Sequence, residues 1–404
     1  MSLVKRGVLS DYFEGVAVKR LSAVETNPQV SNQHEFNVSG ELRRLFGDDD
    51  RRNIATRFIW LGGEQEGVTV DGYITWYDAR RRHPTRTEYR LYFSNAITGL
   101  MKTGDTFFVA LRNDGTAMVI IVPGDGTIQN QLLWLFGMQM QPTLEFAAKD
   151  IRPDEAAEVD FAARYILEEI GIEANELESD WLDSLIDPFG LSFPTTRVLS
   201  AIARESIKGA LPLEEPDNVL LAWMEREEQL FRRLERRVVE ARLRSGFAGG
   251  DDVDVDGFLS FSLSVQNRRK SRAGHALENH LETLFQVHGL RFERGVETEN
   301  KNKPDFLFPG KSEYLDPTFP ASSLLMLGSK SSLKDRWRQV LAEARRIERK
   351  HLITLEPGIS EAQTTQMEAE RLQLVVPAGL HPTYKESQRA WLMDVGDFIR
   401  LARI

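Results

Sequence analysis

The segment KNKPDFLFPG places Asp305 after a proline and before three apolar residues. A carboxylate at the start of a buried strand is either a turn residue or a ligand for a metal ion. Lys330 ends a second apolar run, LLMLGSK, 25 positions later. If the two runs form neighbouring strands, the carboxylate and the ammonium group meet. An acidic ligand with a cation beside it predicts metal-dependent cleavage of a phosphodiester bond.

The order of these residues resembles the PD-(D/E)xK nuclease motif, with one departure. The position two before Lys330, where an acid is expected, is Gly328. We expect the replacement on a helix over residues 333–349, where apolar residues recur at helical spacing. Glu343 lies on the flank of that apolar stripe and can point back to the metal. Glu278, in a predicted helix further upstream, can supply another carboxylate.

Two other functions compete with the nuclease interpretation. Because Gly328 leaves the motif incomplete, the chain could be a DNA-binding regulator with an inactive nuclease fold, which would bind DNA without metal and without nicking it. A Ser-Lys hydrolase would pair Lys330 with Ser329, Ser331 or Ser332. Neighbouring residues on a strand point to opposite faces, so Ser329 is poorly placed for that chemistry.

Four stretches carry a resemblance to a known family: NRRKSRAGHALENHLETLFQVHGL, NKPDFLFP, KDRWRQVLAEA and LVVPAGLH. They resemble the catalytic domain of EcoRII-type restriction endonucleases over most of residues 264–384. In that family the second acidic ligand is displaced onto the helix after the lysine. The resemblance implies that Mg²⁺ binds to Asp305 and Glu343, that Lys330 orients water and phosphate, that Glu278 assists, and that Tyr314 lies near the site.

Recognition of DNA bases is expected at KDRWR, which opens the helix predicted to carry Glu343. Arg can contact guanine bidentately and Asp can accept a hydrogen bond from cytosine. The resemblance implies that Lys334, Asp335 and Arg336 read the C:G pairs of a CC…GG-type target. The alternative is an exposed helix with an internal ion pair. Residues expected to position phosphates or to make further base contacts are Arg232, Arg233, Arg268, Arg269 and Arg272.

The N-terminal part has short alternating apolar runs separated by Gly, Asp and Asn turns, which predict a mainly β domain. VKRLSAVE, SNQHEF and TRTEYRLYF are similar to the effector domain of the same family, a B3-like DNA-binding pseudobarrel. This likeness implies two arms that grip a second copy of the target and relieve autoinhibition. Pro84 stands in the second arm where a basic residue is expected. The implied contact residues are Asn32, Gln33, His34, Glu35, Arg86, Glu88, Tyr89 and Arg90.

Three segments make up the expected organisation of the chain. Residues 1–149 form the B3-like domain, 150–187 an acidic helical linker, and 188–404 an α/β restriction-endonuclease-like core with a mixed sheet flanked by helices. The linker holds thirteen Asp or Glu and two Arg, so it carries a larger negative charge than the net −10 of the whole chain. The remainder is therefore close to neutral and contains clusters of basic residues that suit phosphate contacts.

Composition excludes several classes of protein. Hydrophobic residues make up 41% and charged residues 28% of the chain, as in globular proteins. The absence of cysteine excludes disulfides, thiolate nucleophiles, Fe–S clusters and cysteine-based zinc sites. No apolar run is long enough to span a bilayer, and the N-terminus lacks the apolar stretch of a secretory signal. A cytoplasmic location is expected.

Taken with the resemblance, these patterns predict a bacterial type II restriction endonuclease of the IIE kind. A near-palindromic duplex presents two equivalent strands, so a homodimer is expected. The implied partners are double-stranded DNA in two target copies and a cognate DNA methyltransferase.

Overall fold

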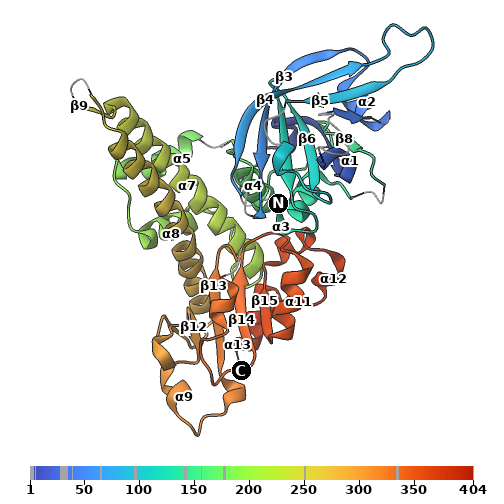
Figure 1. Ribbon diagram of the computed structural model, residues 1–404. Helices are drawn as coiled ribbons and strands as arrows, with labels where there is room; N and C mark the ends of the chain where they lie inside the picture. The colour runs from blue at the N-terminus through green and yellow to red at the C-terminus, as the bar shows by residue number, and fades with distance from the viewer. Residues whose placement is uncertain are drawn as a thin grey trace. The chain divides into compact units, whose positions relative to one another are not determined.

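The chain folds into two compact units in a computed structural model (Figure 1). The structure describes residues 4, 6–27, 35–38, 40–63, 66–94, 98–140, 143–155, 157–175, 179–249, 252–333 and 336–403. The N-terminal unit comprises Arg6–Asn175 and Pro357–Ser360; the C-terminal unit comprises the first five residues, Glu176–Glu356 and Glu361–Ile404. The acidic stretch 150–187, expected to be a linker, is thus divided between the two units.

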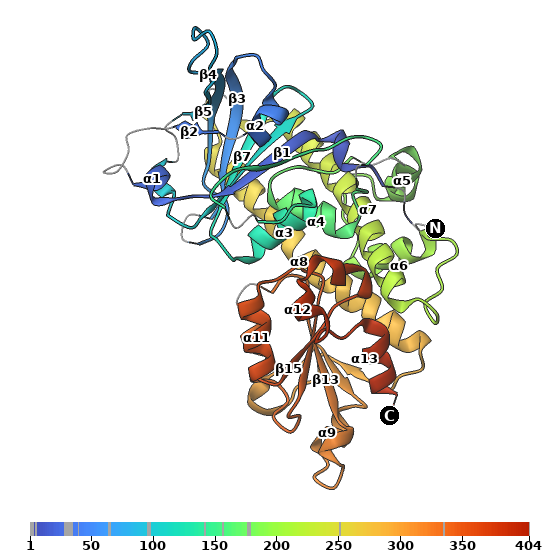
Figure 2. The same cartoon turned by 90° about the vertical axis from the view of Figure 1, so that its right-hand side faces the viewer.

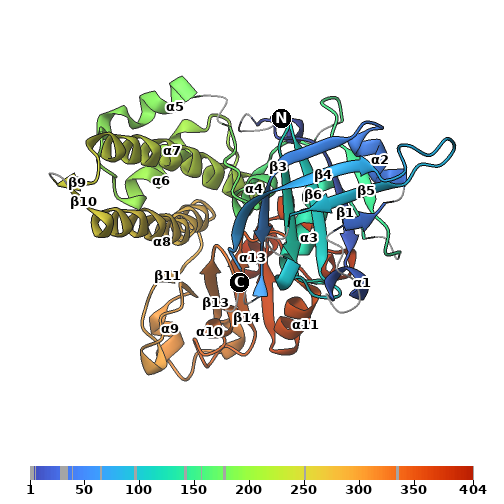
Figure 3. The same ribbon diagram turned by 45° about the horizontal axis from the view of Figure 1, so that its top comes forward.

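An eight-stranded sheet forms the N-terminal unit (Figure 3), in the order β2-β5-β4-β3-β7-β6-β1-β8. All neighbouring strands are antiparallel except β3 and β7, which are parallel. The strands are β1 (Phe13–Arg20), β2 (Glu35–Asn37), β3 (Arg51–Trp60), β4 (Thr69–Asp78), β5 (Tyr89–Phe93), β6 (Thr106–Arg112), β7 (Ala117–Val122) and β8 (Ala147–Asp150).

Both faces of this sheet are buried, because apolar residues continue without interruption along its central strands. In β6, Phe107 and Val109 join one core cluster, whereas Phe108 and Ala110 join the other. This alternation follows from the two-residue period of a strand. The helices of the unit are α1 (Ala23–Thr26), α2 (Gly40–Phe46), α3 (Thr127–Phe136) and α4 (Phe161–Glu169), of which α3 and α4 contribute to the second cluster.

Four helices open the C-terminal unit: α5 (Ser179–Ile186), α6 (Thr196–Ser206), α7 (Pro216–Ser245) and α8 (Val255–Val287). Leu182 of α5, Leu199 of α6 and Phe231 of α7 belong to one buried core cluster. Thr195 caps the start of α6, where its hydroxyl oxygen accepts a hydrogen bond from the amide of Val198 at 3.4 Å. A two-stranded hairpin, β9 (Ala248–Gly249) and β10 (Asp252–Val253), connects α7 to α8.

A five-stranded mixed sheet completes the unit (Figure 2), in the order β11-β12-β13-β14-β15. The pairs β11–β12 and β12–β13 are antiparallel, and β13–β14–β15 are parallel. The strands are β11 (Glu293–Arg294), β12 (Phe306–Phe308), β13 (Leu325–Lys330), β14 (Lys350–Thr354) and β15 (Leu372–Val375). Helices α9 (Lys311–Leu315), α10 (Trp337–Val340), α11 (Glu361–Ala369), α12 (Glu386–Arg389) and α13 (Val395–Ala402) accompany it, which confirms the expected mixed sheet with flanking helices.

The prediction of one helix over 333–349 is wrong. The difference matters for the site, because Glu343 lies in the part that is not helical. Helix α10 ends at Val340, and the amides of Leu341, Ala342 and Glu343 each bond to a carbonyl three residues earlier, as in tight turns rather than an α-helix. Ala344 then has a φ of 45°. The apolar residues of this stripe are nevertheless buried. Their spacing therefore predicted correctly which residues are buried, but not that the helix is continuous.

No helix in the described ranges is both long and apolar enough to cross a membrane.

Candidate active site

Asp305 and Lys330 meet where the chain enters β12 and leaves β13. The antiparallel pairing of Phe306 with Leu327 brings the start of one strand to the end of the other. The Oδ2 atom of Asp305 accepts hydrogen bonds from Nζ of Lys330 at 3.0 Å and from the amide of Ser329 at 2.6 Å. Both side chains are about four-fifths buried, with 20% and 21% exposure. The predicted carboxylate and cation therefore lie together in a partly enclosed position.

Glu343 lies close enough to Asp305 and Lys330 for their charges to act on its carboxylate, although it is in a turn instead of on a helix. Burial, together with the negative charge of Asp305, raises the pKa of Glu343 to about 7, while Lys330 and Lys350 oppose this shift. Its Oε2 atom is buried and has no hydrogen-bond partner among the described residues. A buried carboxylate oxygen without a donor is costly unless another group binds it.

The space that would hold an acid two residues before Lys330 is occupied by α10. Gly328 is on the same face of β13 as Lys330, because residues i and i+2 share a face. A Cβ atom on Gly328 would lie 3.0 and 3.1 Å from the two γ-carbons of Val340 and 3.4 Å from Cδ1 of Leu352. A carboxylate there would be buried among aliphatic groups. Glu343, which follows Val340 by three residues, is the acid that can take its place.

Mg²⁺ fits this set of donors. Hard oxygen ligands suit the ion, which commonly uses one or two carboxylates together with water and substrate phosphates. Asp305 and Glu343 supply two carboxylates, and the buried Oε2 of Glu343, which has no hydrogen-bond partner among the described residues, is free to bind an ion. The described residues contain no cluster of three or more His, Cys, Asp or Glu arranged around a metal position.

Two further residues of the site, Glu299 and Lys350, were missed in the sequence. Tyr314, predicted near the site, donates its hydroxyl hydrogen to the carboxylate of Glu299, with distances of 2.8 and 2.7 Å to the two oxygens. Burial and this hydrogen bond raise the pKa of Tyr314 to about 12. The pKa of Glu299 is lowered: burial would raise it, but hydrogen bonds from Tyr314 and from the amide of Arg345 stabilise the charged carboxylate.

Lys350 is a buried cation at the start of β14. Its Nζ atom donates to the carbonyl of Ile347 at 2.8 Å, and burial lowers the pKa of Lys350 while the charges of Glu299 and Glu343 raise it. The asparagines and proline of ENKNKPD are typical of a turn. Nothing in the sequence indicates that Glu299 bonds to the amide of Arg345, or that Lys350 lies near Glu299 and Glu343.

Glu278 is held by a different partner from the one expected. Its carboxylate accepts a hydrogen bond from Nη2 of Arg294 at 2.6 Å, and Nη1 of Arg294 bonds to Glu282 at 2.8 Å. The structure therefore places Glu278 in an ion-paired group between α8 and β11. A role for Glu278 in the reaction stays a prediction.

Most of the arginines expected to contact DNA are engaged within the C-terminal unit. Lys334 and Asp335 lie outside the described residues, and Arg336 is exposed, with Nη2 donating to the carbonyl of Ser332 at 2.8 Å. Five arginines on α7 and α8 have acidic or aromatic neighbours: Arg232 with Glu228, Arg233 with Asp183, Arg268 over the ring of Phe193, Arg269 with Glu235, and Arg272 with Glu227 and Glu228.

The predicted N-terminal arms are described only in part. Asn32, Gln33 and His34 lie outside the described residues. The carboxylate of Glu35 accepts hydrogen bonds from Tyr77 at 2.6 Å and from Arg90 at 2.8 Å. The other residues predicted to contact DNA differ in their surroundings. Glu88 pairs with Arg90 and Arg80, Tyr89 is buried against Trp76, and Arg86 is exposed.

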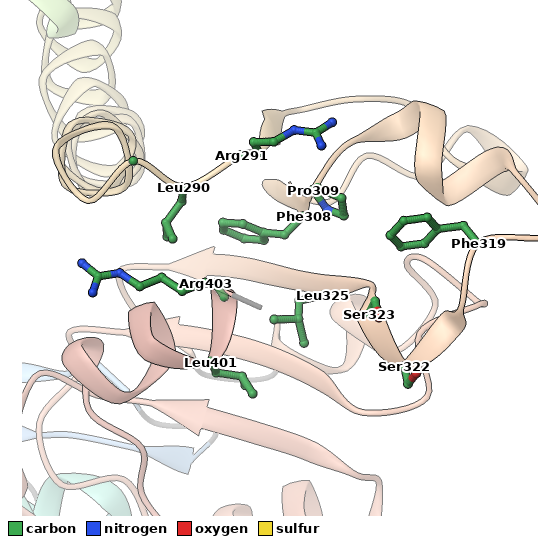
Figure 4. Close-up of a pocket in the computed structure, with 12 residues that line it drawn as sticks. Leu290, Arg291, Phe308, Pro309, Phe319, Ser322, Ser323, Leu325, Leu401 and Arg403 are labelled. Atoms are coloured by element: carbon green, nitrogen blue, oxygen red, sulfur yellow. The ribbon is translucent and has the colours of Figure 1, made fainter.

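A cavity of about 360 Å³ lies elsewhere in the C-terminal unit (Figure 4). Leu290, Phe308, Leu325 and Leu401 line it together with two arginines. Its lining, within the described ranges, does not include Asp305 or Lys330, so this cavity is separate from the candidate site.

The chain is similar to known restriction enzymes. The family model for the C-terminal part of EcoRII matches residues 231–399. The type II restriction enzyme EcoRII of Escherichia coli is 33% identical over 399 residues, which cover 96% of this chain and 93% of that enzyme. Two solved structures also align. A PspGI–substrate DNA complex has a TM-score of 0.43, with 17% identity over 52% of this chain and 91% of that one. Metal-depleted Ecl18kI with uncleaved DNA has a TM-score of 0.42, with 19% identity over 56% and 83%.

The agreement with EcoRII extends over nearly the full length of both chains and includes the segments that carry Asp305, Lys330 and Glu343. The chain therefore belongs to the EcoRII family of type II restriction enzymes.

Proposed function

We propose that this enzyme is a Mg²⁺-dependent restriction endonuclease of the IIE kind, which makes double-strand breaks at a CC…GG-type site similar to CCWGG. The observation that carries the proposal is the convergence of Glu343 on the Asp305–Lys330 pair, with a buried carboxylate oxygen that lacks a hydrogen-bond partner among the described residues. Phosphodiester hydrolysis is the chemistry that two carboxylates and an ammonium group support.

In this proposal each residue of the site has a distinct task. Asp305 and Glu343 hold Mg²⁺ through carboxylate oxygens. The ion, when bound, polarises a phosphate oxygen and makes a water molecule more acidic. Lys330 keeps its ammonium group beside the scissile phosphate, orients the attacking water and stabilises the negative charge that develops in the transition state. The contact between Oδ2 of Asp305 and Nζ fixes that position. In-line attack by the water oxygen forms the new bond to phosphorus and breaks the bond to the 3′-oxygen. The water loses a proton in this step, and the departing 3′-oxygen takes up a proton from solvent.

Base recognition is proposed for Lys334, Asp335 and Arg336, which precede α10. Among these, Arg336 is exposed and its side chain bonds to the local backbone at Ser332. A guanidinium with one face available can contact guanine in the major groove. Only α10 and a short turn separate these residues from Glu343. Binding of the target bases would therefore influence the position of Glu343 at the metal site.

The N-terminal unit is proposed to be a B3-like effector domain that binds a second copy of the target and relieves autoinhibition. Its eight-stranded sheet and the exposed segment around Arg86 support this role. A homodimer is proposed because two equivalent strands require two equivalent sites. Pairing with a cognate DNA methyltransferase, and a cytoplasmic location beside the host DNA, follow from the proposed restriction activity.

Digestion of plasmid DNA, with mapping of the fragment ends, tests this function. We expect the wild type to cut at CC…GG-type sites with Mg²⁺ and to leave the plasmid intact with EDTA. Asp305→Ala should bind the same DNA without cutting it. Cutting by Asp305→Ala, or by the wild type in EDTA, would contradict the assignment. Metal-independent binding by an uncutting wild type would instead identify a regulator with an inactive nuclease fold.

A further inference from the structure

The turn that carries Glu343 is held on both sides by one short segment that precedes Asp305. This segment runs from Thr298 to Asn302 and contains a single turn of 3-10 helix at Glu299–Lys301. Nδ2 of Asn302 donates to the carbonyl of Ala342 at 2.9 Å, on one side of Glu343. The carboxylate of Glu299 accepts a hydrogen bond from the amide of Arg345, on the other side.

Tyr314 adds a second connection to the same carboxylate. Its hydroxyl donates to Glu299 and also accepts a hydrogen bond from the amide of Arg346 at 3.3 Å. The guanidinium of Arg346 in turn donates to the carbonyls of Asp316 at 2.8 Å and Phe319 at 2.7 Å, beyond the end of α9. The backbone on both sides of Glu343 is therefore fixed by side chains.

These bonds take the place of the helical hydrogen bonds that the turn lacks. Ala344 has a φ of 45°, a conformation that a residue with a Cβ atom adopts only when its surroundings enforce it. An amide that leaves the helical pattern needs another acceptor, from the protein or from water. Glu299 and Tyr314 provide acceptors to the two amides that follow Ala344, so they maintain the conformation that directs the Glu343 side chain inward.

We propose that Glu299 and Asn302 are positioning residues for the metal site, which aim the Glu343 carboxylate at the position shared with Asp305. Asp305 follows Asn302 by three residues in the same segment. One segment of the chain thus places both proposed ligands, the first through its own continuation into β12 and the second through the bonds to Ala342 and Arg345. Tyr314 acts through Glu299 and not on the reacting phosphate. The inference deepens the proposed Mg²⁺ site and depends on it.

Charge and geometry can be separated by the choice of variants. Glu299→Gln removes a negative charge close to Glu343 as well as one acceptor, so a loss of metal affinity in this variant has two explanations. Asn302→Ala removes the bond to Ala342 and changes no charge. Glu348→Gln is the matched control, because Glu348 is in the same loop, has 77% side-chain exposure and pairs with Arg371.

The test is a titration of Mn²⁺ into the full chain, with free Mn²⁺ read by electron paramagnetic resonance. Asp305→Ala, which removes a proposed ligand, gives the reference for lost Mn²⁺ binding. Thermal unfolding shows that each variant is folded. We expect Glu299→Gln and Asn302→Ala to bind Mn²⁺ about 10- to 100-fold more weakly, as substitutions behind metal ligands commonly do, and Glu348→Gln to bind like the wild type. Cleavage should lose kcat with little change in KM, and higher Mn²⁺ concentrations should restore part of it.

The outcomes distinguish this inference from the function on which it rests. If the wild type neither binds Mn²⁺ nor cuts DNA, the proposed function fails. If the wild type does both and Asn302→Ala binds Mn²⁺ with unchanged affinity, the positioning role is overturned. If Glu299→Gln does not fold, Asn302→Ala and Tyr314→Phe decide the matter, because each removes one connection to the turn and leaves every charge in place.

Discussion

A Cβ atom on Gly328 would lie 3.0 Å from Cγ2 of Val340, closer than real Cβ contacts normally come. The strand position that carries an acid in the simplest form of the nuclease motif is thus closed by the helix that leads to Glu343. Restoring the motif by Gly328→Glu should lower the free energy of unfolding by about 1–3 kcal/mol through overpacking, with a further cost for a buried charge. Urea unfolding measures this loss, with Gly328→Ala as the milder comparison.

The same relationship predicts that an acid at residue 328 cannot replace Glu343. The double variant Gly328→Glu with Glu343→Ala should remain inactive in single-turnover cleavage. Cleavage by the double variant at a rate near that of the wild type would show that position 328 can reach the metal.

Arg272 should stabilise the fold and not contact DNA directly. Its side chain is 6% exposed, its guanidinium lies 3.6 Å from Glu227 and 4.3 Å from the ring centre of Phe231, and it also pairs with Glu228. Removing one partner of a buried ion pair commonly costs about 3–5 kcal/mol. We therefore expect Arg272→Ala to lose stability of this order in denaturant unfolding. Lys270→Ala, at an exposed neighbouring position, should change stability by less than about 0.5 kcal/mol. Equal effects of the two substitutions would refute the assignment.

Arg86 and Tyr89 should affect the N-terminal unit in different ways. Arg86 is exposed, whereas Tyr89 is 9% exposed and stacks on Trp76 with ring centres 5.0 Å apart. If Arg86 contacts a phosphate, Arg86→Ala should weaken DNA binding by the full chain and reduce the salt slope by about 1, with an unchanged Tm. Tyr89→Ala should instead cost about 3 kcal/mol of stability. Fluorescence anisotropy at several salt concentrations measures DNA binding by Arg86→Ala. An unchanged salt slope would show that Arg86 does not contact a phosphate.

His351 should make the stability of the C-terminal unit depend on pH. Burial, assisted by the charge of Arg349, lowers the pKa of His351 to about 4. The unfolded chain binds a proton at its ordinary pKa near 6.5, so the folded state loses stability as the pH falls from about 6.5 to 4. Glu343, whose pKa is raised, contributes in the opposite direction.

The contribution of His351 is isolated by comparison with His351→Leu, which leaves Glu343 unchanged. Relative to the wild type, this variant should gain stability as the pH falls through that window, as measured by urea unfolding at several pH values. A difference between the two proteins that stays constant from pH 4 to 7 would contradict the shift.

The sequence predicted the strands and the first two members of the site because local patterns determine them. β12 and β13 are short apolar runs, and the residues at their ends, Asp305 and Lys330, are brought together by pairing alone. The resemblance to a known family added Glu343, whose carboxylate is affected by the charges of Asp305 and Lys330; its role as a metal ligand stays a prediction. The mixed sheet followed from the same alternation of strands and helices.

The sequence failed where tertiary contacts override a periodic pattern. Residues Leu333, Trp337, Val340, Ala344 and Ile347 have helical spacing, but Ala344 adopts a left-handed conformation enforced by hydrogen bonds from distant segments. Likewise, the partners of Arg233 and Arg272 come from other helices, so a run of arginines looked like an exposed basic patch. Such pairings are not encoded by local spacing.

The central claim is that Glu343 provides the second carboxylate of the metal site. It is tested most directly by single-turnover cleavage of a target duplex by Glu343→Gln, with binding measured separately in EDTA. Loss of a direct ligand should exceed the effect of substitutions behind ligands, so we expect cleavage to slow by more than about 100-fold while DNA binding is retained. Glu348→Gln should cut at the wild-type rate. Cleavage by Glu343→Gln within about twofold of the wild type, on a scale where tenfold corresponds to about 1.4 kcal/mol, would contradict the account.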